Sequence, residues 1–146
     1  MRIEIDQSGK VEATAIKTVI ADSKGHYITF SAVDKQSLQH IYRLANRPRM
    51  FVYEVFSVLV AIIIKQTYSP ENSYTIDTEY LHQDDLIINL ILQYLKKMKI
   101  YPDKDYVSIS QIGKKSEAHK LAYLKYKTRG HPKKIKIDKI LKILLQ

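Results

Sequence analysis

The sequence predicts an α/β fold in which three antiparallel strands precede parallel strands, giving a five-stranded mixed sheet flanked by helices. Three observations support this prediction: short strand-like segments separated by turn residues at the start of the chain, a long apolar helix, and alternating strand-like and helix-like segments after it. The chain has 146 residues, of which 45% are hydrophobic and 27% charged. That length and composition suit one globular domain with its own core.

The first third of the chain predicts a three-stranded meander. Residues 2–7 alternate between apolar and acidic side chains, which is typical of a strand with one buried face. Residues 11–21 and 26–33 are rich in β-branched and aromatic side chains and predict the second and third strands. Turn residues at 8–10 and 22–25 separate the three segments, and such short connections favour antiparallel pairing.

Helices and strands then alternate along the rest of the chain. Asp34 is the predicted N-cap of a short helix over residues 35–45, and residues 49–66 predict a long apolar helix that is buried against the sheet. The remaining predicted elements are a strand at 74–80, a helix at 84–98, a strand at 106–112, a helix from a Ser116 cap to about residue 127, and a last helix at 138–145. We expect residues 1–130 to form the domain itself. Residues 131–146 then form a basic amphipathic extension that belongs to the same domain or docks on a partner.

Positive charge is concentrated at the end of the chain. Residues 1–113 hold thirteen Lys/Arg and thirteen Asp/Glu, whereas residues 114–146 hold eleven Lys/Arg and two acidic residues, which accounts for the net charge of +9. A basic segment on a neutral body predicts binding to nucleic acid, DNA or RNA, and the alternative is a solvated tail that aids solubility. The predicted nucleic-acid-binding residues are Lys114, Lys115, Lys120, Lys125, Lys127, Arg129, Lys133 and Lys134.

Several classes of protein are disfavoured by features that the sequence lacks. There is no cysteine, so there is no disulfide framework or thiolate metal site, which suits a cytoplasmic protein. The apolar run at residues 51–64 is too short to span a bilayer and contains Glu54, so we expect a buried helix and no membrane association. No phosphate-binding glycine loop or nucleophile elbow is present, which argues against ATP use and covalent hydrolase chemistry.

Glu54 is the one charged residue in the run from residue 50 to residue 64. An ionised carboxylate in an apolar helix is costly unless it is paired or coordinates a cation. Asp6 lies near the end of the first predicted strand, and Asp77 near the end of the fourth. We therefore predict that Glu54 faces Asp6 and Asp77 and that the three carboxylates bind a divalent metal ion.

Four short motifs carry a resemblance to a known family: IDQSG around Asp6, YEVFSVLVAI around Glu54, TIDTEY around Asp77 and SEAHKLA around His119. In their order and spacing over about residues 1–127 they resemble the ribonuclease H-like superfamily, and ribonuclease H type 1 in particular. The resemblance implies that Asp6, Glu54 and Asp77 bind two Mg²⁺ or Mn²⁺ ions. It also implies a metal-dependent nuclease that hydrolyses RNA–DNA hybrid, RNA or structured DNA by a two-metal mechanism.

The fourth site position departs from the family pattern, which usually has Asp where this chain has His119. An imidazole can complete the metal site, can help to move water or product, or can be an ordinary hydrogen-bonded histidine, and Glu117 is a candidate replacement for the missing carboxylate. The departures leave open a non-catalytic nucleic-acid-binding module on the same fold, and also a structural protein whose last helix docks on a partner or forms a homodimer.

Each carboxylate of the predicted site also has an ordinary structural explanation that the sequence leaves open. Asp6 could begin a turn, Glu54 could pair with Arg47 or Arg49, and Asp77 could be a solvated residue at a strand end, where Glu79 shares its face.

Overall fold

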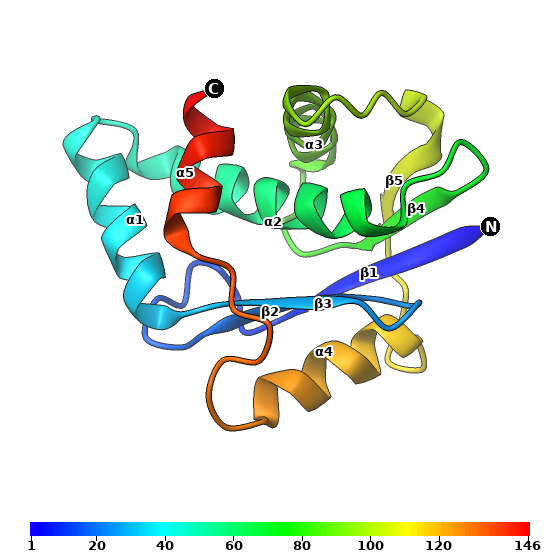
Figure 1. The fold of residues 1–146 in the computed structure, drawn as a ribbon, viewed down its shortest axis with the longest axis horizontal. Coiled ribbons are helices and arrows are strands. Elements are labelled where there is room, and N and C mark those ends of the chain that lie inside the picture. The colour runs from blue at the N-terminus through cyan, green and yellow to red at the C-terminus, as the bar shows by residue number, and fades with distance from the viewer.

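A computed structural model describes all 146 residues and contains one mixed sheet of five strands (Figure 1). The strands are β1 (Arg2–Ser8), β2 (Thr18–Asp22), β3 (Tyr27–Phe30), β4 (Ser73–Asp77) and β5 (Val107–Ser110), in the order β3-β2-β1-β4-β5. The pairs β1–β2 and β2–β3 are antiparallel, and the pairs β1–β4 and β4–β5 are parallel. This arrangement confirms the predicted α/β class and the predicted mixed sheet.

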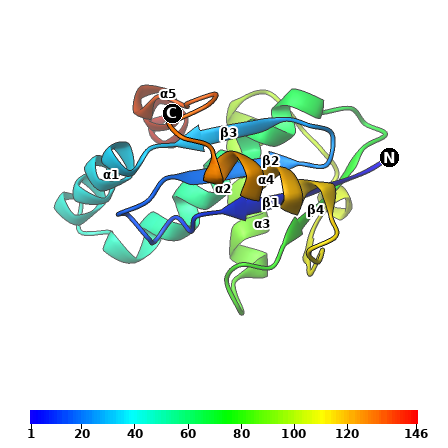
Figure 2. The same cartoon turned by 90° about the horizontal axis from the view of Figure 1, so that it is seen from below.

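The helices lie on both faces of the sheet (Figure 1). They are α1 (Ala32–Leu44), α2 (Phe51–Thr67), α3 (Asp84–Lys97), α4 (Glu117–Lys127) and α5 (Ile137–Leu145), with short 3₁₀ turns η1 (Pro48–Met50) and η2 (Lys104–Tyr106). Figure 2 shows α4 alone across β1 and β2 on one face, whereas the other helices lie on the opposite face. The central strand β1 is therefore covered on both sides.

Most of the hydrophobic core lies between the sheet and α2. Twelve of the seventeen residues of α2 are buried, so this helix is apolar around nearly its whole circumference. By length and composition alone the stretch Pro48–Thr67 could cross a membrane, but 67% of its most apolar window is buried inside the fold. Its hydrophobicity is thus explained by burial within the protein, as the sequence predicted.

Several predicted boundaries were wrong: β3 ends at Phe30 rather than at residue 33, and β4 ends at Asp77 rather than at residue 80. Two further differences have a local cause. β2 begins only at Thr18, because residues 11–17 form turns, and Lys35 holds them through hydrogen bonds to the carbonyl oxygens of Lys10 and Ala13. α1 begins at Ala32 rather than after Asp34: the Ser31 hydroxyl accepts a hydrogen bond from the Asp34 amide at 3.1 Å and is the N-cap.

The C-terminal segment is integrated into this fold. The Thr29 amide donates to the Lys133 carbonyl at 3.1 Å, and the Ile135 amide donates to the Thr29 carbonyl at 2.8 Å, so the segment before α5 covers the outer edge of β3. Ile140 and Ile143 of α5 are buried in the main core. Residues 131–146 therefore pack on the rest of the fold, and the docking of this segment on a partner stays a prediction.

Candidate functional site

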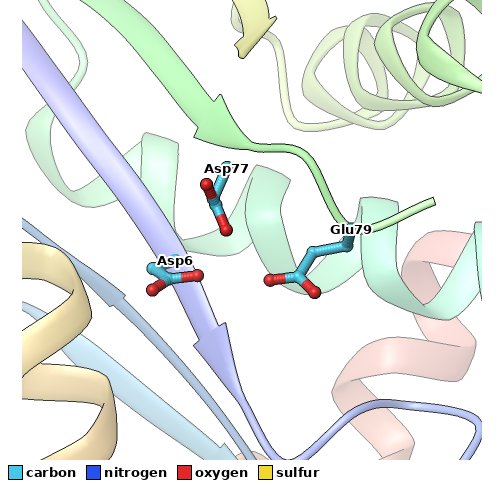
Figure 3. Close-up of side chains that lie close together, drawn as sticks. All are labelled: Asp6, Asp77 and Glu79. Carbon is cyan, nitrogen blue, oxygen red and sulfur yellow. The ribbon is translucent and has the colours of Figure 1, made fainter. Parts of the chain in front are cut away.

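Three carboxylates, from β1, from β4 and from the segment directly after β4, converge at one end of the sheet. Asp6 lies near the end of β1, Asp77 is the last residue of β4, and Glu79 comes two residues later. Figure 3 shows the three carboxyl groups directed toward one another, and one oxygen of each lies within 4.8 Å of the others. We call Asp6, Asp77 and Glu79 the acidic cluster.

The strand register brings the two aspartates together. Ile5 of β1 pairs with Ile76 of β4 in the parallel ladder, so the next residues, Asp6 and Asp77, continue side by side. Asp77 is further fixed by the Ile112 amide, which donates to its Oδ1 at 3.0 Å. The carboxyl ends of neighbouring parallel strands are where open α/β sheets place their ligand sites.

Aromatic packing positions the third carboxylate. The Tyr80 ring, next to Glu79, makes edge contacts with Tyr53 and Phe56 of α2 at centroid distances of 5.8 and 5.3 Å. The Tyr80 hydroxyl donates to Glu12 at 3.0 Å. These contacts hold the segment after β4 against α2 and direct Glu79 back toward Asp6.

The acidic cluster is electrostatically unfavourable without a counter-charge. Burial raises the pKa of Glu79 to about 8, and the neighbouring charges of Asp6 and Asp77 add to that rise. Burial also raises the pKa of Asp6, against the opposing effect of a hydrogen bond with His119. A bound cation would remove this repulsion, and Mg²⁺ and Mn²⁺ both prefer sets of carboxylate oxygens.

The side chain of Gln7 lies beside the acidic cluster and adds an uncharged polar group to it. It is 7% exposed, and its side-chain amide donates to the Tyr80 hydroxyl at 3.3 Å. A hydrogen bond from the same side chain lowers the pKa of Glu79. Its carbonyl oxygen Oε1 is buried and has no hydrogen-bond partner, which is uncommon for a buried polar atom. The donor set at this end of the sheet therefore fits a hard divalent cation.

His119, on α4, contacts the acidic cluster through Asp6. Its Nδ1 lies 2.8 Å from Asp6 Oδ2, and 38% of its side chain is exposed. His119 also lines a polar hollow at the surface whose other walls are Asp77, Thr78, Gln111, Gly113 and Lys114. The structure thus places His119 beside the acidic cluster, where it is hydrogen-bonded to Asp6. His119 is not itself one of the three groups whose ligand atoms converge.

The prediction that Glu54 faces Asp6 and Asp77 was wrong. The Glu54 carboxylate accepts a hydrogen bond of 2.6 Å from the Tyr42 hydroxyl and forms an ion pair with Arg47. Tyr53 and Phe56 occupy the α2 surface toward Tyr80, so Glu54 is turned toward α1 and α5. It lies there in a small apolar cavity lined also by Leu38, Ile41, Tyr42, Ala45, Arg47, Leu141, Leu144 and Leu145. Pairing with Arg47, an alternative left open by the sequence, is the arrangement in the structure.

Glu79 takes the third position in the acidic cluster that the sequence assigned to Glu54. One sequence signal pointed to it: Glu79 comes two residues after Asp77, the spacing that places strand residues on the same face. The stronger signal, an isolated charge in an apolar helix, led to Glu54 instead.

The predicted nucleic-acid-binding cations differ in their surroundings. Lys120 pairs with Glu117 at 3.4 Å, and Lys134 pairs with Asp34 at 3.8 Å. The other six make no ion pair: Lys114, Lys115, Lys125, Lys127, Arg129 and Lys133. Lys114 lines the polar hollow beside Asp77, so one unpaired cation directly adjoins the acidic cluster.

Comparison of the chain with protein-family models, curated proteins and solved structures finds no match.

Proposed function

We propose that this protein is a metal-dependent nuclease of the ribonuclease H-like kind, with Asp6, Asp77 and Glu79 as its metal ligands. The observation that carries the proposal is the convergence of three carboxylates within 4.8 Å at the ends of two adjacent parallel strands. Carboxylates held this close repel one another, and a divalent cation is the counter-charge that their oxygens favour.

Mg²⁺ or Mn²⁺ bound here would supply activation of water and stabilisation of the leaving oxygen of a phosphodiester. The residues of the chain have separate parts in this proposal. Asp6, Asp77 and Glu79 hold the cation, and His119 fixes the orientation of the Asp6 carboxylate through its Nδ1. Lys114, at the edge of the polar hollow, is placed to contact a phosphate beside the cleaved bond.

The experiment that tests the proposal is cleavage of labelled RNA–DNA hybrid, single-stranded RNA and a DNA junction with Mg²⁺ or Mn²⁺. Asp77→Asn and Glu79→Gln should each lower the rate at least about 10–100-fold, the loss that removal of even outer-shell partners of metal ligands causes. Glu54→Gln is the matched control. It also neutralises one buried carboxylate, which is 7% exposed, but this carboxylate is bonded to Tyr42 and lies outside the acidic cluster. Equal rates for wild type and Glu79→Gln would refute the assigned ligand set.

A non-catalytic nucleic-acid-binding module is the second candidate. It is favoured by one observation: the fourth position is His119, whose Nδ1 is already engaged with Asp6, so three carboxylates and not four compose the cluster. This candidate predicts salt-sensitive binding to nucleic acid and no cleavage with either metal.

A further inference from the structure

Two lysine side chains meet on a single tyrosine ring on the α4 side of the sheet. The Nζ atoms of Lys125 and Lys133 lie 4.9 and 4.7 Å from the centroid of the Tyr27 ring. Tyr27 begins β3, Lys125 is in the last turn of α4, and Lys133 lies in the segment that covers the edge of β3. Neither lysine forms an ion pair. We call Tyr27, Lys125 and Lys133 the lysine–tyrosine cluster.

Two ammonium groups near one ring repel each other, so an arrangement without a carboxylate leaves a local excess of positive charge. The ring stabilises each cation through its π face. Because both cations lie within 5 Å of the same centroid, they are less than about 10 Å apart, close enough to contact one phosphodiester group or two consecutive ones.

The backbone holds Lys133 in place at a cost. Its φ is 48°, in the left-handed region that residues other than glycine rarely adopt. Its carbonyl is bonded to the Thr29 amide, and Lys17 Nζ donates to the Gly130 carbonyl at 2.7 Å, which fixes the loop before it. These bonds fix the backbone of Lys133, so its side chain is held beside the Tyr27 ring.

We propose that the lysine–tyrosine cluster is a clamp for the sugar–phosphate backbone of a nucleic-acid strand whose neighbouring segment lies at the acidic cluster. The inference rests on the proposed function for the identity of the polyanion. Lys125 comes six residues after His119 along α4, or about 9 Å along the helix axis. At about 3.4 Å of axis per nucleotide, the strand reaches the clamp two to three nucleotides from the acidic cluster.

Salt-dependent binding tests the clamp separately from catalysis. The wild-type chain in a chelator, where no cleavage occurs, is titrated against fluorescein-labelled 20-nucleotide RNA, DNA and hybrid over about 50–300 mM salt. The double variant Lys125→Ala/Lys133→Ala should reduce the slope of log K against log salt by about two, since each phosphate contact contributes about one. The affinity should fall at least tenfold at the lowest salt.

A glycine variant separates a binding role from a structural one. Lys133→Gly relieves the left-handed strain, so its melting temperature should be equal to or above that of the wild type, whereas its salt slope should fall by about one. Lys99→Gly is the matched control: Lys99 is also exposed and left-handed, with a φ of 64°, but lies after α3 on the opposite face of the sheet. Its slope should equal that of the wild type.

The outcomes distinguish the clamp from the nuclease. Unchanged slope and affinity in the double variant would overturn the clamp even if the protein cleaves nucleic acid. An equal loss in Lys99→Gly and Lys133→Gly would also overturn it, because the charge would then act without regard to position. A third outcome would support the clamp and refute the nuclease. In it, Lys133→Gly but not Lys99→Gly lowers the slope of log K against log salt, and the wild-type protein shows no metal-dependent cleavage.

Discussion

His119 Nδ1 and Asp6 Oδ2 lie 2.8 Å apart and connect α4 to the central strand at the acidic cluster. Since an ionised carboxylate only accepts, the hydrogen belongs to Nδ1, and Nε2 is left as the free ring nitrogen. The family resemblance implied a metal ligand at position 119. In the structure the imidazole is hydrogen-bonded to Asp6. Under the proposed function His119 would therefore orient a metal ligand rather than bind the metal itself, which is a common role of hydrogen-bond partners around metal sites.

His119→Asp should make the acidic cluster more dependent on metal. A carboxylate in place of the imidazole would face Asp6 with a like charge and lose the hydrogen bond that opposes the rise in the Asp6 pKa. We expect a lower melting temperature than that of the wild type without metal and a larger increase on adding Mn²⁺. Thermal melting of both proteins with and without Mn²⁺ measures this, and equal metal-induced increases would contradict it.

The stability of the metal-free protein should fall as the pH rises. Burial raises the pKa of Glu79 from 4.5 to about 8, so within this window the folded state holds a proton that the unfolded state has released. The free energy of unfolding should therefore decrease between about pH 5 and pH 8, by on the order of 1–2 kcal/mol because the carboxyl group is partly exposed.

Glu79→Gln is the test of that pH dependence. The amide cannot ionise, so the variant should lose less stability than the wild type over the same pH range in a chelator. Urea denaturation at several pH values gives both curves. Parallel curves for the two proteins would show that another group is responsible.

The Arg47–Glu54 pair should matter for stability and not for the acidic cluster. Arg47→Met leaves the Glu54 carboxylate with Tyr42 as its remaining partner, in an apolar cavity. We expect a loss of about 1–3 kcal/mol, less than for a fully buried pair because the Arg47 side chain is 54% exposed. Urea denaturation measures the loss, and Mn²⁺-induced stabilisation should remain that of the wild type.

Periodicity in the sequence predicted the strands of the site, whereas the direction of the Glu54 side chain could not be predicted. Alternation along residues 2–7 and 74–80 identified the two strands that carry Asp6 and Asp77, although β4 ends at Asp77. Their adjacent parallel placement brings the aspartates together. The helix that carries Glu54 was also predicted. Its rotation, however, is set by the packing of Tyr53 and Phe56 on Tyr80, a contact between distant segments.

Residues 11–17 illustrate a second limit of periodicity. Their composition favours a strand, yet the backbone forms turns in which the Ala13 amide donates to the Lys10 carbonyl and the Ile16 amide to the Ala13 carbonyl. The distant Lys35 ammonium donates to the same two carbonyl groups and so fixes the turns against α1. The burial of this lysine is not visible in the sequence, where Lys35 stands at the start of a predicted helix, a position that is usually exposed to solvent.

That lysine gives the last prediction. Lys35 is fully buried, and its Nζ donates to the carbonyl oxygens of Lys10 and Ala13 and to the Thr18 hydroxyl at 2.9–3.1 Å. Lys35→Met should cost about 1–3 kcal/mol near neutral pH, because the Thr18 hydroxyl and the two carbonyl groups lose the ammonium donor, although the carbonyl groups keep their bonds from the Ala13 and Ile16 amides. Burial lowers the pKa of Lys35 from 10.5 to about 8, so between these values the unfolded state binds more protons. The free energy of unfolding of the wild type should therefore rise relative to that of Lys35→Met as the pH increases from about 7.5 to 9.5. The reason is that burial of the neutral amine costs less free energy than burial of the ammonium group. Urea denaturation of both proteins across this range measures the difference in the free energy of unfolding. A difference that decreases with pH would contradict the lowered pKa of Lys35.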